Sequence, residues 1–165
     1  MKLGLMSDTH DDHEMARRGV IALLEGGATT LLHMGDIGSS RVLEELVGHD
    51  AHVVFGNCDH DVAGLTSSCE QFAITVHHPA GTLQTPRGEL VFTHGHLGSE
   101  IDSALTRGAA YLIHGHTHVQ ADRMHGTTRV INPGALHATD LYTVAILDVE
   151  RDELSVIEIS SSREI

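Results

Sequence analysis

Short apolar segments alternate with polar clusters along this chain, and five of the clusters combine Asp, Asn or His with Gly or Thr. In chain order they are Asp8-Thr9-His10, Gly35-Asp36, Gly56-Asn57, Thr93-His94-Gly95-His96 and Gly115-His116-Thr117-His118. Each cluster stands at or just past an apolar run that is typical of a β-strand. Gly beside a polar residue lets the backbone turn sharply, and ligands gather at the carboxyl ends of strands in open α/β sheets. The order therefore predicts an α/β fold in which these side chains meet.

These clusters supply seven side chains that can bind a metal ion: Asp8, His10, Asp36, Asn57, His94, His116 and His118. Any single match is weak evidence, because a chain with 15 His is expected to contain about one Asp-x-His and one His-x-His pair by chance. The information lies in their order and in their placement at strand ends. Carboxylate, amide and imidazole ligands suit Mn, Fe, Ni or Zn better than a thiolate site would. Seven groups exceed the needs of one ion, so the pattern predicts a two-metal hydrolase.

The bulk properties limit the classes of protein that this chain can belong to. A length of 165 residues predicts a single domain over residues 1–165. No apolar stretch approaches the roughly 20 residues that span a bilayer, and the apolar start is too short for a secretory signal. We therefore expect a soluble, cytoplasmic protein with no membrane partner. A net charge of −13 argues against a nucleic-acid duplex as partner, whereas a homo-oligomer stays open.

Hydrophobic periodicity predicts the secondary structure. Strands are expected at 2–7, 30–34, 52–55, 74–78, 81–84, 89–93, 110–114, 121–124, 128–131, 142–148 and 154–159, and helices at 12–25, 40–47 and 99–107. Asp11 and Glu14 resemble a capping box for the first helix. The β-α-β-α-β beginning predicts parallel strands, and the many strands with a few helices predict two packed sheets flanked by helices.

Taken as a set, the motifs resemble those of the calcineurin-like metallophosphoesterase superfamily. The resemblance runs from Leu3 to about Asp148 and includes Asn132-Pro133-Gly134, which is expected to be a structural turn near the site. The short chain and the sequence Gly56-Asn57-Cys58-Asp59 resemble the small YfcE-type phosphodiesterase branch. The resemblance implies a four-layer α/β-β/α sandwich, in which two mixed β-sheets are flanked by helices and the metals lie at one edge.

The resemblance also implies a ligand set and a reaction. Asp8, His10, Asp36 and His118 would hold one divalent ion, and Asp36, Asn57, His94 and His116 would hold the other, with Asp36 bridging. Mn²⁺ is the expected metal, with Ni²⁺, Fe²⁺, Zn²⁺ or Mg²⁺ as alternatives. The expected enzyme is a phosphodiesterase that cleaves a small phosphodiester through a metal-bridging hydroxide, with Asp36, Asn57 and His94 as catalytic residues. Two alternatives stay open: a phosphomonoesterase or nucleotidase, and a non-catalytic protein-interaction scaffold of the same fold, as in the retromer complex.

Cys58 departs from the family pattern, because many members carry at this position a His that is thought to protonate the leaving group. A thiol is a poor substitute, so good leaving groups are expected to be favoured. We expect Cys58 to pack as a small buried hydrophobe, with a supporting position beside the ligands as the alternative. Asp59 and His96 are expected to support the ligands or the substrate. Other histidines are expected to pack, to form hydrogen bonds or to lie on the surface: His33, His49, His52, His77, His78, His114, His125 and His137.

Overall fold

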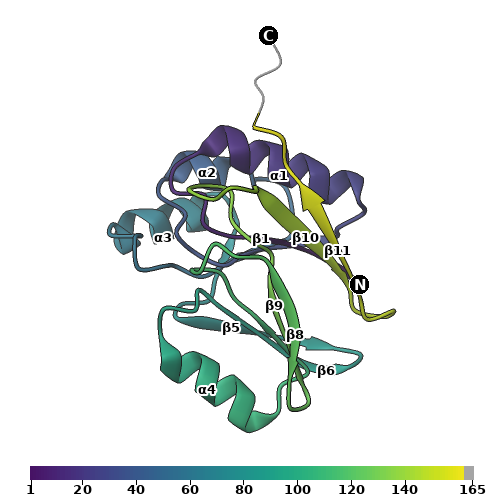
Figure 1. The fold of residues 1–165 in the computed structure, drawn as a ribbon. Helices are drawn as coiled ribbons and strands as arrows, with labels where there is room; N and C mark the ends of the chain where they lie inside the picture. Colours follow the sequence, from purple (N-terminus) through teal and green to yellow (C-terminus); the bar gives the residue numbers. More distant parts are fainter. Residues whose placement is uncertain (162–165) are drawn as a thin grey trace.

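The computed structural model describes residues 1–161. In these residues the chain forms two β-sheets that lie face to face, with helices on both outer sides (Figure 1). The elements are β1 (Lys2–Met6), α1 (His13–Glu25), β2 (Thr30–His33), α2 (Ser40–Glu44), β3 (Ala51–Val53), α3 (Val62–Gln71), β4 (Thr75–Val76), β5 (Ala80–Thr85), β6 (Gly88–Thr93), α4 (Gly98–Arg107), β7 (Tyr111–Ile113), β8 (Ala121–His125), β9 (Thr128–Asn132), β10 (Thr143–Asp148) and β11 (Glu153–Glu158).

Both sheets are mixed. The first has the strand order β11-β10-β1-β2-β3-β4, and its strands β1 to β4 are parallel. The second has the order β5-β6-β7-β9-β8, and its central strands β6, β7 and β9 are parallel. Helices α1, α2 and α3 cover the outer side of the first sheet, and α4 covers the second (Figure 1). The predicted four-layer α/β arrangement is confirmed.

Side chains point alternately to the two faces of each strand, and this divides the core into layers. In β1, Leu3 and Leu5 point into a cluster between the two sheets, where they meet Phe92 and Ile113 of the second sheet. Met6 instead belongs to the cluster beneath the helices of the first sheet. Because neighbouring strand residues point to opposite faces, both faces of this short strand are buried. Burial on both faces fixes its register and holds the segment that follows it in place.

Several predicted elements differ from those observed. Helix α3 was not located by the sequence pattern, because only Leu65 and Cys69 of its ten residues are buried and its apolar stripe is weak. The first helix is capped by Asp12, whose side chain accepts the Met15 amide hydrogen, so the prediction of Asp11 as the capping residue is wrong. Asp11 has a φ of 68° and its carboxylate contacts Ser39 instead. Within residues 1–161, no helix has the length and apolar character needed to cross a bilayer.

Two histidines near one side of the first sheet pair with each other: His52 lies in β3, and His77 follows the edge strand β4. His52 Nδ1 lies 2.9 Å from His77 Nε2, and the His77 ring meets the Phe92 ring edge-on. Asp50 Oδ1 lies 3.3 Å from the other ring nitrogen of His52. Burial, with the neighbouring His52, lowers the pKa of His77 below its usual value.

This lowered pKa predicts a pH-dependent contribution to stability. Below pH of about 6.5, the usual pKa of His, the unfolded chain binds a proton at position 77 more readily than the folded chain. Acid therefore favours unfolding. Replacement of His77 by Gln is expected to flatten the fall in unfolding free energy between about pH 7 and pH 5, measured by denaturant titration. His125→Gln, at an exposed position of β8, serves as control, and equal slopes in parent and His77→Gln would contradict the prediction.

Candidate metal centre

The polar clusters occupy the carboxyl ends of strands in both sheets. Asp8 follows β1 and Asp36 follows β2, whereas His94 follows β6 and His116 follows β7. Backbone hydrogen bonds join these loops: the Asp8 amide donates to Gly35 O (3.0 Å), and the Gly115 amide donates to His94 O (2.9 Å). The parallel strands of both sheets end at the same edge, so residues far apart in sequence come together there.

The backbone of this edge is strained at the predicted ligands. Five of the seven have a positive φ: Asp8 (55°), His10 (43°), Asp36 (53°), His116 (68°) and His118 (58°). Residues other than Gly seldom adopt such angles, and each instance costs about 1–3 kcal/mol. Strain concentrated in this way is typical of functional sites. Neighbouring glycines make room for the loops, since a Cβ on Gly56 would overlap the Asp36 carboxylate.

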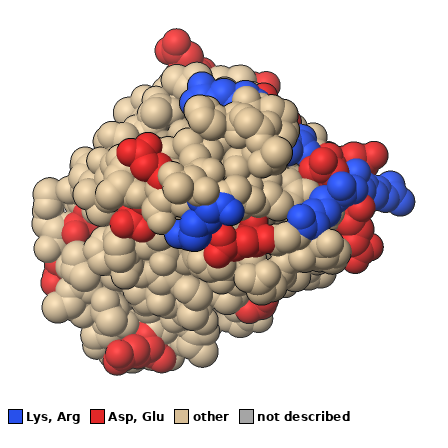
Figure 2. Space-filling model, turned by 90° about the horizontal axis from the view of Figure 1, so that it is seen from below, with Lys and Arg blue, Asp and Glu red and all other residues tan. Residues whose placement is uncertain are grey.

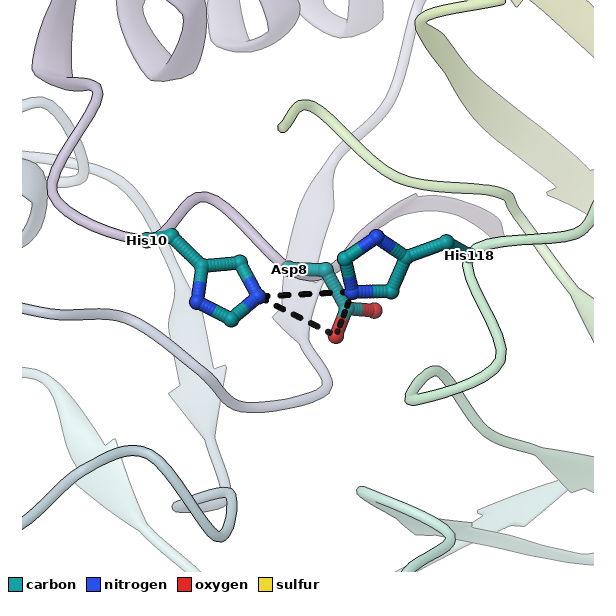
Figure 3. Close-up of side chains that lie close together, drawn as sticks. All are labelled: Asp8, His10 and His118. Carbon is teal, nitrogen blue, oxygen red and sulfur yellow. Dashed lines mark hydrogen bonds and ion pairs between the residues drawn. The ribbon is translucent and has the colours of Figure 1, made fainter. Parts of the chain in front are cut away.

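Asp8, His10 and His118 form the first group of candidate ligands (Figure 3). His10 Nε2 lies 3.3 Å from His118 Nε2. Asp8 Oδ2 accepts hydrogen bonds from the Ser7 hydroxyl (2.6 Å) and the His116 amide (3.0 Å). Asp8 Oδ1 is buried and makes no hydrogen bond, although His118 Nε2 and His10 Nε2 lie 3.3 and 3.9 Å away.

An unpartnered carboxylate oxygen in a buried position is costly. Here that oxygen points toward two imidazole nitrogens, which is a donor set that a divalent cation satisfies. The buried Asp8 oxygen is therefore the clearest sign within residues 1–161 that this cluster fits a metal ion.

His94 lies at the centre of the second group of candidate ligands. Its Nδ1 lies 2.6 Å from the Met34 carbonyl oxygen, and because a carbonyl only accepts, Nδ1 carries a proton. Its Nε2 faces two further oxygens, Asn57 Oδ1 at 3.1 Å and Asp36 Oδ2 at 3.4 Å. Burial alone lowers the pKa of His94, but the hydrogen bonds to Asp36 and Met34 raise it overall. A cation among these three atoms would take the place of the proton on Nε2.

Asp36 connects the two groups. Its Oδ2 lies 3.5 Å from His10 Nε2 and 3.4 Å from His94 Nε2, and its Oδ1 accepts the Cys58 amide hydrogen at 2.8 Å. Burial works against the charged carboxylate, but the hydrogen bonds from His94 and the Cys58 amide hold the pKa of Asp36 well below its usual range. The carboxylate is therefore ionised and faces both groups with one oxygen.

The remaining predicted residues lie around these groups. Asp59 is buried and braces the loops by accepting the Gly38 and Gly56 amide hydrogens (2.9 and 2.8 Å). The His96 ring lies 5.3 Å from the His94 ring, and its buried Nδ1 makes no hydrogen bond. His116 is exposed, and its ring packs 5.0 Å from that of His94. His116 thus lies at the site through its ring contact with His94 and its amide hydrogen bond to Asp8. Its ring nitrogens do not belong to the close groups of candidate ligand atoms among the described residues.

Cys58 differs from the sequence interpretation, whereas His137 is exposed as predicted and also contacts the site. Cys58 is exposed, so the prediction of a buried packing residue is wrong: the backbone amide is held by Asp36, and this turns the side chain toward the site instead of the core. The ring of His137 lies 5.2 Å from that of His10. This contact depends on the path of the loop after Asn132. The Asn132 side chain holds the start of this loop by donating hydrogen bonds to Gly115 O and Thr117 Oγ1 (both 3.0 Å). No sequence motif indicated the contact between His137 and His10.

The two mixed sheets with their outer helices have the arrangement of the phosphoesterase fold, and the Asp- and His-rich edge is a candidate site for metal-dependent hydrolysis. Residues 1–152 match the calcineurin-like phosphoesterase superfamily domain, and the chain belongs to this family. Enzymes of this family depend on metal ions, and the clustered Asp and His side chains are candidate ligands for them.

Individual relatives are similar over nearly the whole chain. Phosphodiesterase MJ0936 of Methanocaldococcus jannaschii is 29% identical over 159 residues, which cover 93% of this chain and 96% of the relative. The solved structure of an archaeal phosphodiesterase is 28% identical, with a TM-score of 0.86 over 96% of this chain and 100% of that chain. The E. coli phosphoesterase YfcE is 23% identical, with a TM-score of 0.73 over 97% of this chain and 100% of its own, and shares the fold.

Proposed function

We propose that this protein is a phosphodiesterase that uses two divalent ions, with Mn²⁺ as the preferred metal. The observation that carries the proposal is the position of Asp36 Oδ2, at 3.5 Å from His10 Nε2 and 3.4 Å from His94 Nε2. A single carboxylate that faces two groups of ligands suits a pair of ions that share it. The names of the relatives, which are phosphodiesterases, support cleavage of a diester.

Each group of side chains would hold one ion. Asp8, His10 and His118 would bind the first and Asn57, His94 and His116 the second, with Asp36 common to both. Two such ions, when bound, would supply a nucleophile derived from water and would neutralise the charge that develops on the phosphoryl oxygens. Asn57 contributes a neutral oxygen, which limits the negative charge around the ions.

The side chains themselves orient the site and leave it open. The Met34 carbonyl fixes the tautomer and the orientation of the His94 ring, as supporting hydrogen bonds do for metal-binding histidines in general. Asn57 and His116 are exposed, so a phosphoryl group can approach from solvent. His96, whose Nδ1 makes no hydrogen bond, is suited to support a bound substrate from the side of the second ion.

The proposed substrate is a small phosphodiester and not a nucleic-acid duplex. The net charge of −13 opposes binding to a phosphate backbone, and Figure 2 shows only a few basic side chains on one face of the molecule. A cytoplasmic location and a homo-oligomeric state stay predictions.

The presence of a Cys58 thiol in place of His predicts that the enzyme prefers substrates with good leaving groups. Partial desolvation of this exposed thiol, with the nearby Asp36 carboxylate, raises its pKa, which makes it a weak acid for protonating an alkoxide. With Mn²⁺ present, an activated aryl diester is expected to turn over roughly 100-fold faster or more than an alkyl monoester, in line with the usual size of acid catalysis. A colorimetric assay for the aryl diester and release of inorganic phosphate from the monoester measure the two rates.

Comparable rates would contradict this assignment and favour a phosphomonoesterase or nucleotidase. Removal of the metal by a chelator should abolish hydrolysis, and Mn²⁺ should restore it, with two ions per chain by metal analysis. A folded protein that binds Mn²⁺ and hydrolyses none of these esters would support the scaffold alternative.

A further inference from the structure

Cys58 is an exposed thiol beside the candidate metal centre, and the proposed reaction gives it no role as a ligand. Its Sγ, a ring nitrogen of His10 and a carboxylate oxygen of Asp36 all lie within 4.8 Å of one another. A Zn²⁺ ion has bonds of about 2.0–2.1 Å to nitrogen and oxygen and about 2.3 Å to sulfur. Atoms spread over this distance can surround one ion after a small rotation of the exposed thiol.

Two contacts hold Cys58 near the candidate ligands. The Cys58 amide donates to Asp36 Oδ1 at 2.8 Å, so the residue follows Asp36 in any adjustment of the loop. The Asn57 side-chain amide donates to Cys58 Sγ at 3.4 Å, and this contact turns the Asn57 oxygen toward His94. The sulfur therefore faces the ligands and not the solvent alone.

A second and independent observation points to a cation at the adjoining cluster, which shares His10. Asp8 Oδ1 is fully buried, makes no hydrogen bond and lies 3.9 Å from His10 Nε2. His10 belongs to both three-residue clusters, that with Asp8 and His118 and that with Asp36 and Cys58. The unpartnered Asp8 oxygen therefore marks His10 as a residue that faces a cation, and Cys58 lies beside the same ring.

We propose that Cys58 joins His10 and Asp36 as a ligand for thiophilic divalent cations such as Cd²⁺ or Zn²⁺. Binding forms a metal–sulfur bond and releases the thiol proton to solvent, with no change in oxidation state. Hard ions such as Mg²⁺ prefer oxygen and do not recruit the thiol. The site therefore distinguishes soft from hard ions through one side chain. The inference rests on the metal-binding part of the proposed function and not on the hydrolysis.

The test is a Cd²⁺ titration of the metal-free protein, followed by the ultraviolet charge-transfer absorption of the cadmium–thiolate bond. The parent is expected to show this band, and Cys58→Ser is expected to lack it and to bind Cd²⁺ roughly tenfold more weakly or worse. The affinity for Mn²⁺, measured by competition, should change by less than about threefold. Cys69→Ser is the matched control, since Cys69 is buried in the core and burial raises its pKa to about 11.

A further pair of variants tests the position of the ion. His10→Ala should weaken Cd²⁺ binding as Cys58→Ser does, whereas His60→Ala, at an exposed position of the same loop as Cys58, should not. The proposal is overturned by a parent without the band, by a band that survives Cys58→Ser, or by an affinity that does not depend on His10. A clear band in a protein that hydrolyses no diester would end the proposed function and leave this inference standing.

Discussion

Replacement of Asp36 by Asn is expected to lower Mn²⁺-dependent diester hydrolysis by about three orders of magnitude or more. Asn has nearly the same volume and can still accept the Cys58 amide hydrogen through its oxygen, but it removes the charge that faces His10 and His94. Loss of several kcal/mol of transition-state stabilisation corresponds to this factor. The rate is measured with an activated aryl diester at saturating Mn²⁺.

The accompanying measurement is the number of bound ions. Asp36→Asn should fall below two ions per chain while its circular dichroism spectrum stays that of the parent. Asp102→Asn, which changes an exposed aspartate on α4, serves as matched control and should keep both activity and metal content. Full activity in Asp36→Asn would rule out a shared carboxylate and with it the proposed function.

The second large effect is expected at His33, which does not face the candidate ions. It is fully buried at the end of β2, and burial lowers its pKa to about 3, so the ring is neutral. Its Nδ1 accepts the Gly35 amide hydrogen at 3.2 Å. Its Nε2 therefore carries the proton and donates to Thr9 Oγ1 at 3.0 Å. The Thr9 hydroxyl in turn donates to Ile37 O at 3.1 Å.

This network ties the loop of Asp8 and His10 to the loop of Asp36. His33→Ala is expected to lower the unfolding free energy by about 2–4 kcal/mol, because it leaves a cavity and unpaired polar groups. It should also weaken Mn²⁺ binding by about 10–100-fold, the usual effect of removing a side chain that supports metal ligands. Denaturant unfolding and metal titration measure the two quantities.

His33→Gln separates positioning from packing, since its amide can still donate to Thr9. We expect it to recover much of the Mn²⁺ affinity while it recovers only part of the stability. His125→Ala, exposed on β8, should behave as the parent. If His33→Ala binds Mn²⁺ as tightly as the parent, His33 has a packing role only.

The site residues were most predictable from the sequence where a polar motif directly follows an apolar strand. Asp8, Asp36 and His94 each follow an apolar strand closely, and the parallel order of β1, β2 and β6, β7 brings these ends to one edge. Fold class and family were therefore predictable from motif order. Helix α3 was missed because its stripe is short, and Asp12 caps α1 in place of its neighbour because Asp11 adopts a positive φ.

Details of the site depend on backbone angles that no residue type dictates. Cys58 is exposed, and its amide is held by a tertiary hydrogen bond to Asp36. The approach of His137 to His10 depends on the path of the loop that follows Asn132. Such contacts arise from tertiary structure, so they cannot be predicted from hydrophobic periodicity or local propensity.

The left-handed backbone at five of the candidate ligands means that the residues needed for activity lower the stability of the fold. Glycine would adopt these angles without steric cost, but it would also remove the hydrogen bonds that the Asp8 and Asp36 carboxylates accept. Each ligand retained there costs about 1–3 kcal/mol, which the buried strands behind the loops must outweigh. Engineering for thermal robustness should therefore leave this edge untouched and work on the helices and the far ends of the sheets.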